Sequence, residues 1–156
     1  MPDTRRAFLK ASVALSAYSL ATATGLVAPA TTEADWIADF FSPGTLDETI
    51  QKTFHTTKIY NTDKIELKLP SIAENGAVVP ITITSTLDLI EQVFILVEKN
   101  PIPLAAVFDL SPDVEAFVST RLKIAETCNV IVVVKAATQL YKTQQAVKVT
   151  IGGCGG

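Results

Sequence analysis

The sequence is poor in metal-binding side chains and in positive charge. Its 156 residues include one histidine and two cysteines, too few soft ligands for a zinc or iron-sulfur site built by this chain alone. Thirteen lysine and arginine residues against sixteen acidic residues give a net charge of −3, so no broad basic surface exists to neutralise a phosphate backbone. We therefore expect no metal, no cofactor and no nucleic acid partner.

Charged residues are also scarce, at 19% of the chain, whereas hydrophobic residues reach 48%. This balance is too apolar for a disordered polymer, and the chain is too short for two ordinary domains. A hydrophobic fraction of this size is consistent with a subunit that buries part of its surface in a complex.

The first thirty residues are predicted to be a twin-arginine export signal. Arg5-Arg6 precedes an uncharged stretch over residues 11–30, and Ala28-Pro29-Ala30 offers small residues at a cleavage site. A membrane anchor is the alternative, but polar residues dilute the stretch and no charged stop-transfer segment follows it. We therefore expect residues 1–30 to be removed and the remaining chain to be periplasmic, with no membrane association after cleavage.

A helical segment over residues 31–60 is predicted to lead into the folded domain. Apolar residues spaced along one helical face end at Phe41, and Pro43-Gly44 follows. A second helix begins at Thr45, because Glu48 stands three residues on, the spacing of a capping box. His55, near the end of this helix, is expected to lie on the surface or to cap the helix C-terminus rather than to bind a metal.

From residue 61 the hydrophobic period changes from about 3.6 to 2, which indicates strands. Seven segments with this pattern are separated by turn residues: 65–69, 78–85, 93–97, 104–110, 116–125, 130–136 and 146–151. The expected fold is therefore all-β, an immunoglobulin-like antiparallel β-sandwich of about seven strands over residues 61–151. A small closed barrel is the alternative architecture.

One loop, from Pro70 to Pro80, contains the tight-turn dipeptide Asn75-Gly76. Both residue types tolerate a positive φ, so a structural hairpin turn explains the pair. The functional alternative is that Glu74 and Asn75 help to form a partner-docking edge.

The side chain best suited to a chemical role, the thiol of Cys154, lies near the C-terminus. Cys154 lies between two glycine pairs, which are Gly152, Gly153, Gly155 and Gly156, and residues 152–156 are predicted to form a flexible arm because glycine has no side chain to pack. A mobile thiol is a poor enzyme nucleophile, which needs a base and an oxyanion hole held in place. It suits a carrier whose cargo enters the pockets of several enzymes, and sulfur is the natural cargo of a thiol.

Several stretches together resemble the SoxY family, the sulfur-carrying subunits of the thiosulfate-oxidising Sox system. They are residues 70–80, Asn100-Pro101-Ile102-Pro103, Thr120-Arg121, Ala125-Glu126-Thr127 and residues 149–156. The terminal Gly-Gly-Cys-Gly-Gly is the specific motif among them, because it stands at the end of a chain that is predicted to be an exported β-sandwich.

The resemblance implies that Cys154 is the covalent attachment site for thiosulfate-derived sulfur. It implies three partner enzymes: a haem-containing enzyme that couples thiosulfate to the cysteine, a hydrolase that releases sulfate, and, where present, a sulfane dehydrogenase. It further implies a heterodimer with the smaller immunoglobulin-like subunit SoxZ, which is expected to cover an apolar face of the sandwich. The carrier itself is not expected to be an enzyme.

The other candidate residues have structural interpretations. Cys128 precedes a run of valines and isoleucine and is expected to be a small core residue, although a disulfide with Cys154 is the alternative. Arg121 and Lys123 are expected to share one strand face. Either this face is exposed to solvent, or Arg121 forms an ion pair there at a partner interface.

Three functional hypotheses remain. The first is the covalent sulfur carrier. The second is a ubiquitin-like carrier that activates a C-terminal thiocarboxylate after a diglycine; Arg5-Arg6 and the strand pattern count against it. The third is an exported binding module in which Cys154 is incidental, which leaves the position of that cysteine unexplained.

Overall fold

A computed structural model describes residues 40–111 and 113–150 of the chain. The predicted signal peptide at 1–30, the predicted helix before Phe40 and the arm at 152–156 lie outside the described residues. In the described part, no helix is both long and apolar enough to cross a membrane.

Helix α3 (Leu46–Phe54) begins and ends where the sequence predicts. The Thr45 hydroxyl accepts a hydrogen bond from the Glu48 amide at 3.3 Å, and the Glu48 carboxylate accepts one from the Thr45 amide at 2.9 Å. These bonds satisfy two amides that the first helical turn leaves without partners. His55 ends the helix in the left-handed region, with φ of 52°, and donates its amide to the Gln51 carbonyl. Both predicted caps are confirmed.

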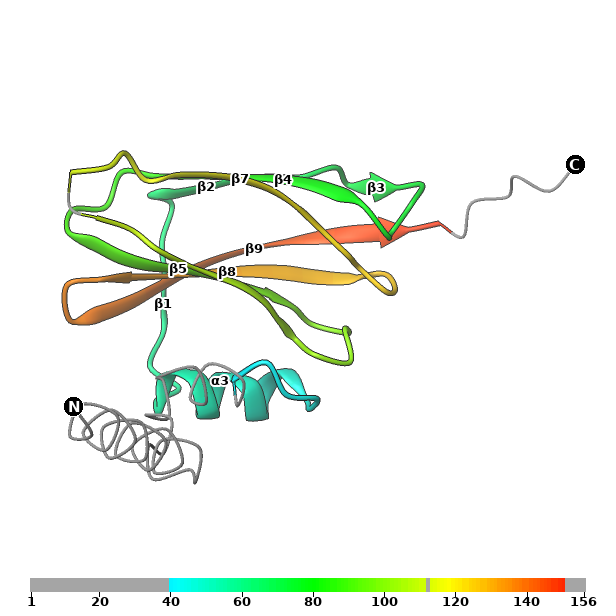
Figure 1. Cartoon of the computed structure of the whole chain (residues 1–156), viewed down its shortest axis with the longest axis horizontal. Coiled ribbons are helices and arrows are strands. Elements are labelled where there is room, and N and C mark those ends of the chain that lie inside the picture. The colour runs from blue at the N-terminus through cyan, green and yellow to red at the C-terminus, as the bar shows by residue number, and fades with distance from the viewer. Residues whose placement is uncertain (1–39, 112, 151–156) are drawn as a thin grey trace, which may run out of the picture. The chain divides into compact units, whose positions relative to one another are not determined.

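Among the described residues, nine strands follow the helix: β1 (Tyr60–Asn61), β2 (Ile65–Lys68), β3 (Ile72–Ala73), β4 (Val79–Ser85), β5 (Ile90–Val97), β6 (Leu104–Asp109), β7 (Phe117–Leu122), β8 (Cys128–Ala136) and β9 (Gln139–Val149). One sheet has the order β1-β9-β8-β5-β6, with β3 also paired to β9, and the other has the order β2-β4-β7. Figure 1 shows the two sheets stacked face to face. The predicted all-β, immunoglobulin-like sandwich is confirmed.

The main core lies between the two sheets. Strand β4 sends alternate side chains inward, so Val79, Ile81 and Ile83 are buried while the residues between them face outward. They pack with inward residues of the larger sheet such as Ile95 and Val132. The period-2 pattern in the sequence thus identifies the inner face of the smaller sheet.

Helix α3 covers the other face of the larger sheet (Figure 1). Its apolar residues Leu46, Ile50 and Phe54 pack on a second cluster that includes Phe94 and Val133. The rings of Phe54 and Phe94 meet edge to face with centroids 4.8 Å apart, a favoured geometry for aromatic pairs. Strands β5 and β8 are therefore buried on both faces, which explains why their sequences are continuous apolar runs rather than alternating ones.

The prediction of the last strand was wrong in extent, and two short strands were not predicted. Strand β9 begins at Gln139 rather than residue 146. Its first half was missed because it is polar, and it is a strand because it pairs along β8. The two-residue strands β1 and β3 were not predicted, and both pair with β9 in parallel. The sandwich is thus antiparallel in its long ladders, with two short parallel additions along one edge of β9.

Candidate functional site at the end of β9

The predicted working residue Cys154 and its four neighbouring glycines, Gly152, Gly153, Gly155 and Gly156, lie outside the described residues. The structure does describe the chain up to Thr150, four residues before Cys154. Four residues span at most about 14 Å when fully extended. The candidate site is therefore the end of β9 and the loops that hold it.

One edge of β9 is held by β3. The Lys148 amide donates to the Ser71 carbonyl at 2.8 Å, and the Thr150 amide donates to the Ala73 carbonyl at 3.0 Å. Ala73 is buried in the main core. Because the acceptor residue is fixed by packing, the backbone of β9 is fixed through Thr150 on this side.

The other edge of β9 is held by a side chain. Strand β8 begins only at Cys128, opposite Val147, so no backbone partner from β8 faces Val149. The Thr127 hydroxyl takes that place: it accepts from the Val149 amide at 3.0 Å and donates to the Val149 carbonyl at 3.4 Å. A hydroxyl can do both because it has a donor and two acceptor lone pairs. In the sequence, Thr127 stands out only as part of the Ala125-Glu126-Thr127 stretch that carries the resemblance, and no structural role is predicted for it.

The loop containing Asn75-Gly76 packs against the same strand end, and it is not the predicted hairpin. Its flanking strands β3 and β4 lie in different sheets. Nor does Gly76 have a positive φ. The Asn75 carboxamide oxygen instead accepts from the Ala77 amide at 2.9 Å, and the chain crosses from one sheet to the other.

Gly76 is required by a close approach rather than by its backbone angles. Its carbonyl accepts from the Ile124 amide at 2.7 Å. A Cβ at this position would lie 2.4 Å from the Ile124 carbonyl oxygen and 2.8 Å from Cγ1 of Val149. Glycine therefore lets this loop, the chain after β7 and the end of β9 meet without a gap.

Asn100 anchors the chain between β7 and β8. Its carboxamide nitrogen donates to the Lys123 carbonyl at 2.7 Å, and its oxygen accepts from the Ala125 amide at 2.9 Å. The structure thus brings together, at one end of the sandwich, three stretches far apart in sequence that carry the resemblance: residues 70–80, the Asn100-Pro101 turn and residues 125–127. All three lie where β9 ends.

Arg121 and Lys123 belong to this end but do not share a strand, because β7 ends at Leu122. Both side chains are exposed, and neither forms a salt bridge with a described residue. The ion pair expected for Arg121 at a partner interface remains a prediction.

Cys128 is a core residue, as predicted. It is 7% exposed, packs in the main core and is a free thiol. Burial raises the pKa of the Cys128 thiol, because the low-dielectric surroundings disfavour its charged form. A neutral, inaccessible thiol is a poor nucleophile.

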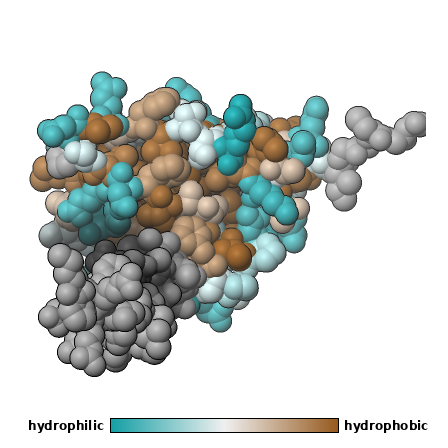
Figure 2. All heavy atoms as spheres, in the orientation of Figure 1, coloured by the Kyte–Doolittle hydropathy of each residue, from teal (hydrophilic) through white to brown (hydrophobic). Residues whose placement is uncertain are grey.

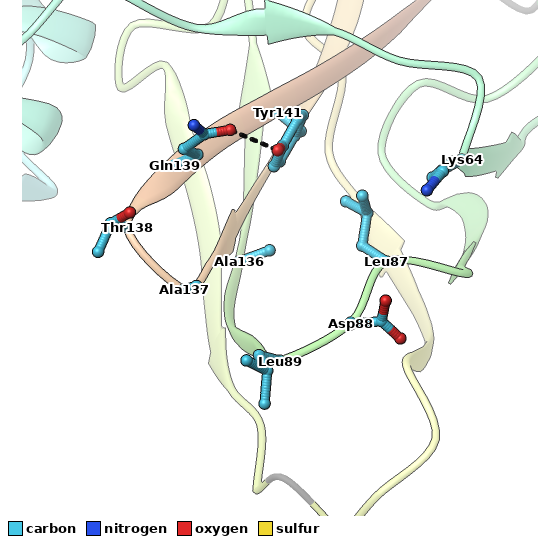
Figure 3. A pocket seen from close by; sticks show the side chains of 9 residues that line it. All are labelled: Lys64, Leu87, Asp88, Leu89, Ala136, Ala137, Thr138, Gln139 and Tyr141. Carbon is cyan, nitrogen blue, oxygen red and sulfur yellow. Dashed lines mark hydrogen bonds between the residues drawn. The ribbon is translucent and has the colours of Figure 1, made fainter.

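A cavity of about 400 Å³ lies at the other end of the sandwich (Figure 3). It is lined by residues between β4 and β5, including Leu89, and by the turn between β8 and β9 at Ala137. These two residues have left-handed backbones and are joined by a hydrogen bond from the Ala137 amide to the Leu89 carbonyl. The length of β9, at about 3.3 Å per residue, places this cavity about 30 Å from Val149. It is not part of the site at the end of β9.

Comparison with known proteins agrees with the resemblance. The family model for sulfur oxidation protein SoxY matches residues 50–154. The structure is similar to that of the sulfur carrier protein SoxY from Chlorobium limicola f thiosulfatophilum, with 38% sequence identity, a TM-score of 0.62, and coverage of 69% of this chain and 97% of the other. No curated protein matches the chain.

A more distant similarity concerns the fold alone. A superoxide reductase (neelaredoxin) variant E23A from Ignicoccus hospitalis has a TM-score of 0.53 at 13% identity, over 60% of this chain and 95% of the other. In the part of our chain that the structure describes, no group of three or more His, Cys, Asp or Glu residues is placed to hold a metal ion. The SoxY match, by contrast, extends over two thirds of the sequence and includes Cys154. The chain belongs to the SoxY family of sulfur oxidation proteins.

Proposed function

We propose that this chain is a covalent carrier of sulfur intermediates in periplasmic thiosulfate oxidation, with Cys154 as the attachment site. The observation that carries the proposal is the end of β9, which is hydrogen-bonded on both edges up to Val149 and Thr150. The Gly-Gly-Cys-Gly-Gly sequence follows one residue later. A fixed strand followed by a glycine-rich segment is the arrangement that a swinging arm needs.

The first step is an oxidative coupling at Cys154. Its thiolate and one thiosulfate dianion form a new sulfur-sulfur bond and release two electrons, which leaves a cysteine-bound thiosulfonate with one negative charge. The two electrons pass to the haem-containing partner enzyme that performs the coupling.

The second step is hydrolysis by the sulfate-releasing partner. Water cleaves the bond between the outer sulfonate and the sulfane sulfur, giving sulfate, two protons and a persulfide anion on Cys154. A sulfane dehydrogenase then oxidises this remaining sulfur where that enzyme is present. The chain holds the sulfur through each step and catalyses none of them.

The choice of Cys154 over Cys128 follows from accessibility. Cys128 is buried and its pKa is raised, so it has neither the exposure nor the thiolate population that sulfur transfer needs. The segment around Cys154 has no lysine, arginine or histidine, and the Gly156 carboxylate disfavours a nearby thiolate. Activation of the Cys154 thiol is therefore left to the pocket of the partner enzyme.

The proposal includes a partner subunit and a location. SoxZ is the proposed heterodimer partner, and the twin-arginine signal at residues 1–30 is proposed to export the chain to the periplasm. The apolar face of the larger sheet already has a cover within this chain, because α3 packs on it. The SoxZ-binding surface is thus expected elsewhere on the sandwich.

Intact-mass analysis of protein purified from cells grown on thiosulfate tests the proposal. We expect mass increments of sulfur and of thiosulfonate that map to Cys154, disappear with a reductant and are absent from Cys154→Ser. Thiosulfate oxidation should be lost in the Cys154→Ser strain. The matched Cys128→Ala variant should keep both the adducts and the oxidation.

Two outcomes would favour the other hypotheses. Modification confined to the Gly156 carboxylate would support a ubiquitin-like thiocarboxylate carrier. An unmodified C-terminus together with undiminished thiosulfate oxidation in the Cys154→Ser strain would support an exported binding module.

A further inference from the structure

The short distance between Cys154 and the end of β9 limits where an enzyme can contact this protein. Cys154 is four residues beyond Thr150, a span of at most about 14 Å. Part of that length is used inside the enzyme pocket that receives the sulfur. If the carrier function above holds, the rim of such a pocket must rest on the residues that surround the end of β9.

Two large apolar side chains are exposed there, although the residue that follows each of them is buried. Ile72 is 56% exposed in β3, beside Lys148 of β9, and Val78 is 53% exposed directly before β4. Ala73 and Val79, which follow them, are buried in the main core. Apolar side chains on a surface mark contact sites when they gather near a functional element. Hydrophobic and hydrophilic side chains are interspersed at this end of the sandwich (Figure 2).

The backbone that carries Ile72 and Val78 is fixed. The residues on either side of Ile72 accept hydrogen bonds from β9. Val78 donates its amide to the Asn75 carbonyl at 3.4 Å, and the adjoining Gly76 is packed against Ile124. A contact surface on such a segment loses little conformational entropy when a partner binds.

We propose that Ile72 and Val78, with the exposed polar residues Glu74 and Asn75 between them, are the docking surface for the enzymes that process the sulfur on Cys154. The occupant is the rim of an enzyme pocket that admits the cysteine adduct. The two apolar side chains supply contact area that successive enzymes share, and the two polar ones supply hydrogen-bonding groups at the rim.

The test measures turnover of the loaded carrier. The whole chain, together with its partner subunit if the two co-purify, is loaded on Cys154 by reaction with tetrathionate, which transfers a thiosulfonate group and releases thiosulfate. The sulfate-releasing hydrolase is then assayed against increasing carrier concentration. For the double variant Ile72→Gln and Val78→Gln we expect KM to rise about tenfold with kcat unchanged.

Leu89→Gln is the matched control, because Leu89 is 69% exposed but lies at the opposite end of the sandwich. Its KM should stay within about twofold of the wild-type value. The rate at which N-ethylmaleimide modifies Cys154 should be the same in all variants, since a small reagent needs no docking surface. Equal thermal unfolding temperatures would show that the variants are folded.

Three results would overturn the docking surface while leaving the carrier function intact. The first is an unchanged KM for the double variant. The second is loss of the partner subunit on gel filtration, which would assign these side chains to the heterodimer interface. The third is conversion of a wild-type dimer to a monomer, which would assign them to a second copy of this chain. Failure of the carrier function itself would be seen separately, as absence of the Cys154 adduct in cells.

Discussion

At the scale of single residues, the Cys128 thiol is kept neutral by its position in the core. It packs between the sheets and its pKa is raised by burial. The pKa of this thiol is therefore higher in the folded state than in the unfolded state. At pH values below the unfolded-state pKa, the thiol makes its full contribution to the free energy of unfolding. That contribution is lost as the pH rises through the folded-state pKa, because the unfolded thiol ionises first.

We predict that Cys128→Ala lowers the free energy of unfolding by about 1 kcal/mol at neutral pH, because it leaves a small cavity. The difference from the unsubstituted protein should shrink above about pH 8.5, where an ordinary thiol begins to ionise. Urea unfolding between pH 6 and pH 10 measures this, with both proteins carrying Cys154→Ser so that one thiol titrates. A difference that grows with pH would contradict a raised pKa.

At the scale of elements, the end of β9 is built by three different kinds of partner. Strand β3 supplies backbone carbonyls on one edge, the Thr127 side chain supplies the other edge, and the Gly76 backbone packs against Val149. Only the first of these is ordinary strand pairing. The position at which β9 stops is therefore set by tertiary contacts, and it fixes how far Cys154 can reach.

We predict that Thr127→Val lowers the protection of the Val149 amide against hydrogen exchange by at least tenfold. Valine is close to threonine in shape but has no hydroxyl to accept the bond, so the amide exchanges through a smaller opening. The measurement is residue-resolved hydrogen exchange by NMR. The Lys148 amide, which donates to the Ser71 carbonyl, is the internal control and should keep its protection.

Thr127→Ser is the matched variant, because it keeps the hydroxyl and should keep the protection of Val149 within about threefold. If both variants exchanged equally, the methyl group rather than the hydroxyl of Thr127 would be responsible. Unchanged protection in Thr127→Val would show that β3 alone holds the strand end.

At the scale of the whole molecule, the described part of the chain has three layers rather than two. Helix α3 covers the face of the larger sheet that the sandwich core does not use. The rings of Phe54 and Phe94 meet edge to face in this layer. The helix is therefore part of the folded unit and not only a connection between the signal and the first strand.

We predict that Phe54→Ala lowers the free energy of unfolding by about 3 kcal/mol, because it removes the aromatic side chain that covers Phe94. Gln51→Ala on the exposed side of α3 is the matched control and should change it by less than about 0.5 kcal/mol. Both are measured by urea unfolding. A loss under 1 kcal/mol for Phe54→Ala would mean that α3 contributes little to the core.

Sequence patterns were sufficient where a residue's role depends on its immediate neighbours. The capping box at Thr45 is local, and the alternation in β4 reports a sheet with one buried face. These patterns failed for segments that carry no hydrophobic period and for contacts between residues far apart in the sequence. The polar first half of β9 shows no hydrophobic period and is a strand because β8 lies beside it, and β3 is too short to show any period. The Asn75-Gly76 pair was wrongly predicted to be a hairpin turn, because the chain alone does not show that Ile124 and Val149 pack against Gly76.

The fold class, the boundaries of α3, the family resemblance and the prediction of Cys154 as the attachment site could all be read from the sequence, because periodicity, capping and a terminal motif each lie in consecutive residues. The surroundings of the point from which the proposed arm extends depend on the tertiary structure. Ala73 and Gly76 lie far in the sequence from Asn100, from Thr127 and from the end of β9, and the hydrogen bonds and close contacts among these segments exist only when the two sheets have packed. The burial that makes Cys128 unreactive is decided in the same way, because desolvation of a thiol depends on every element packed around it.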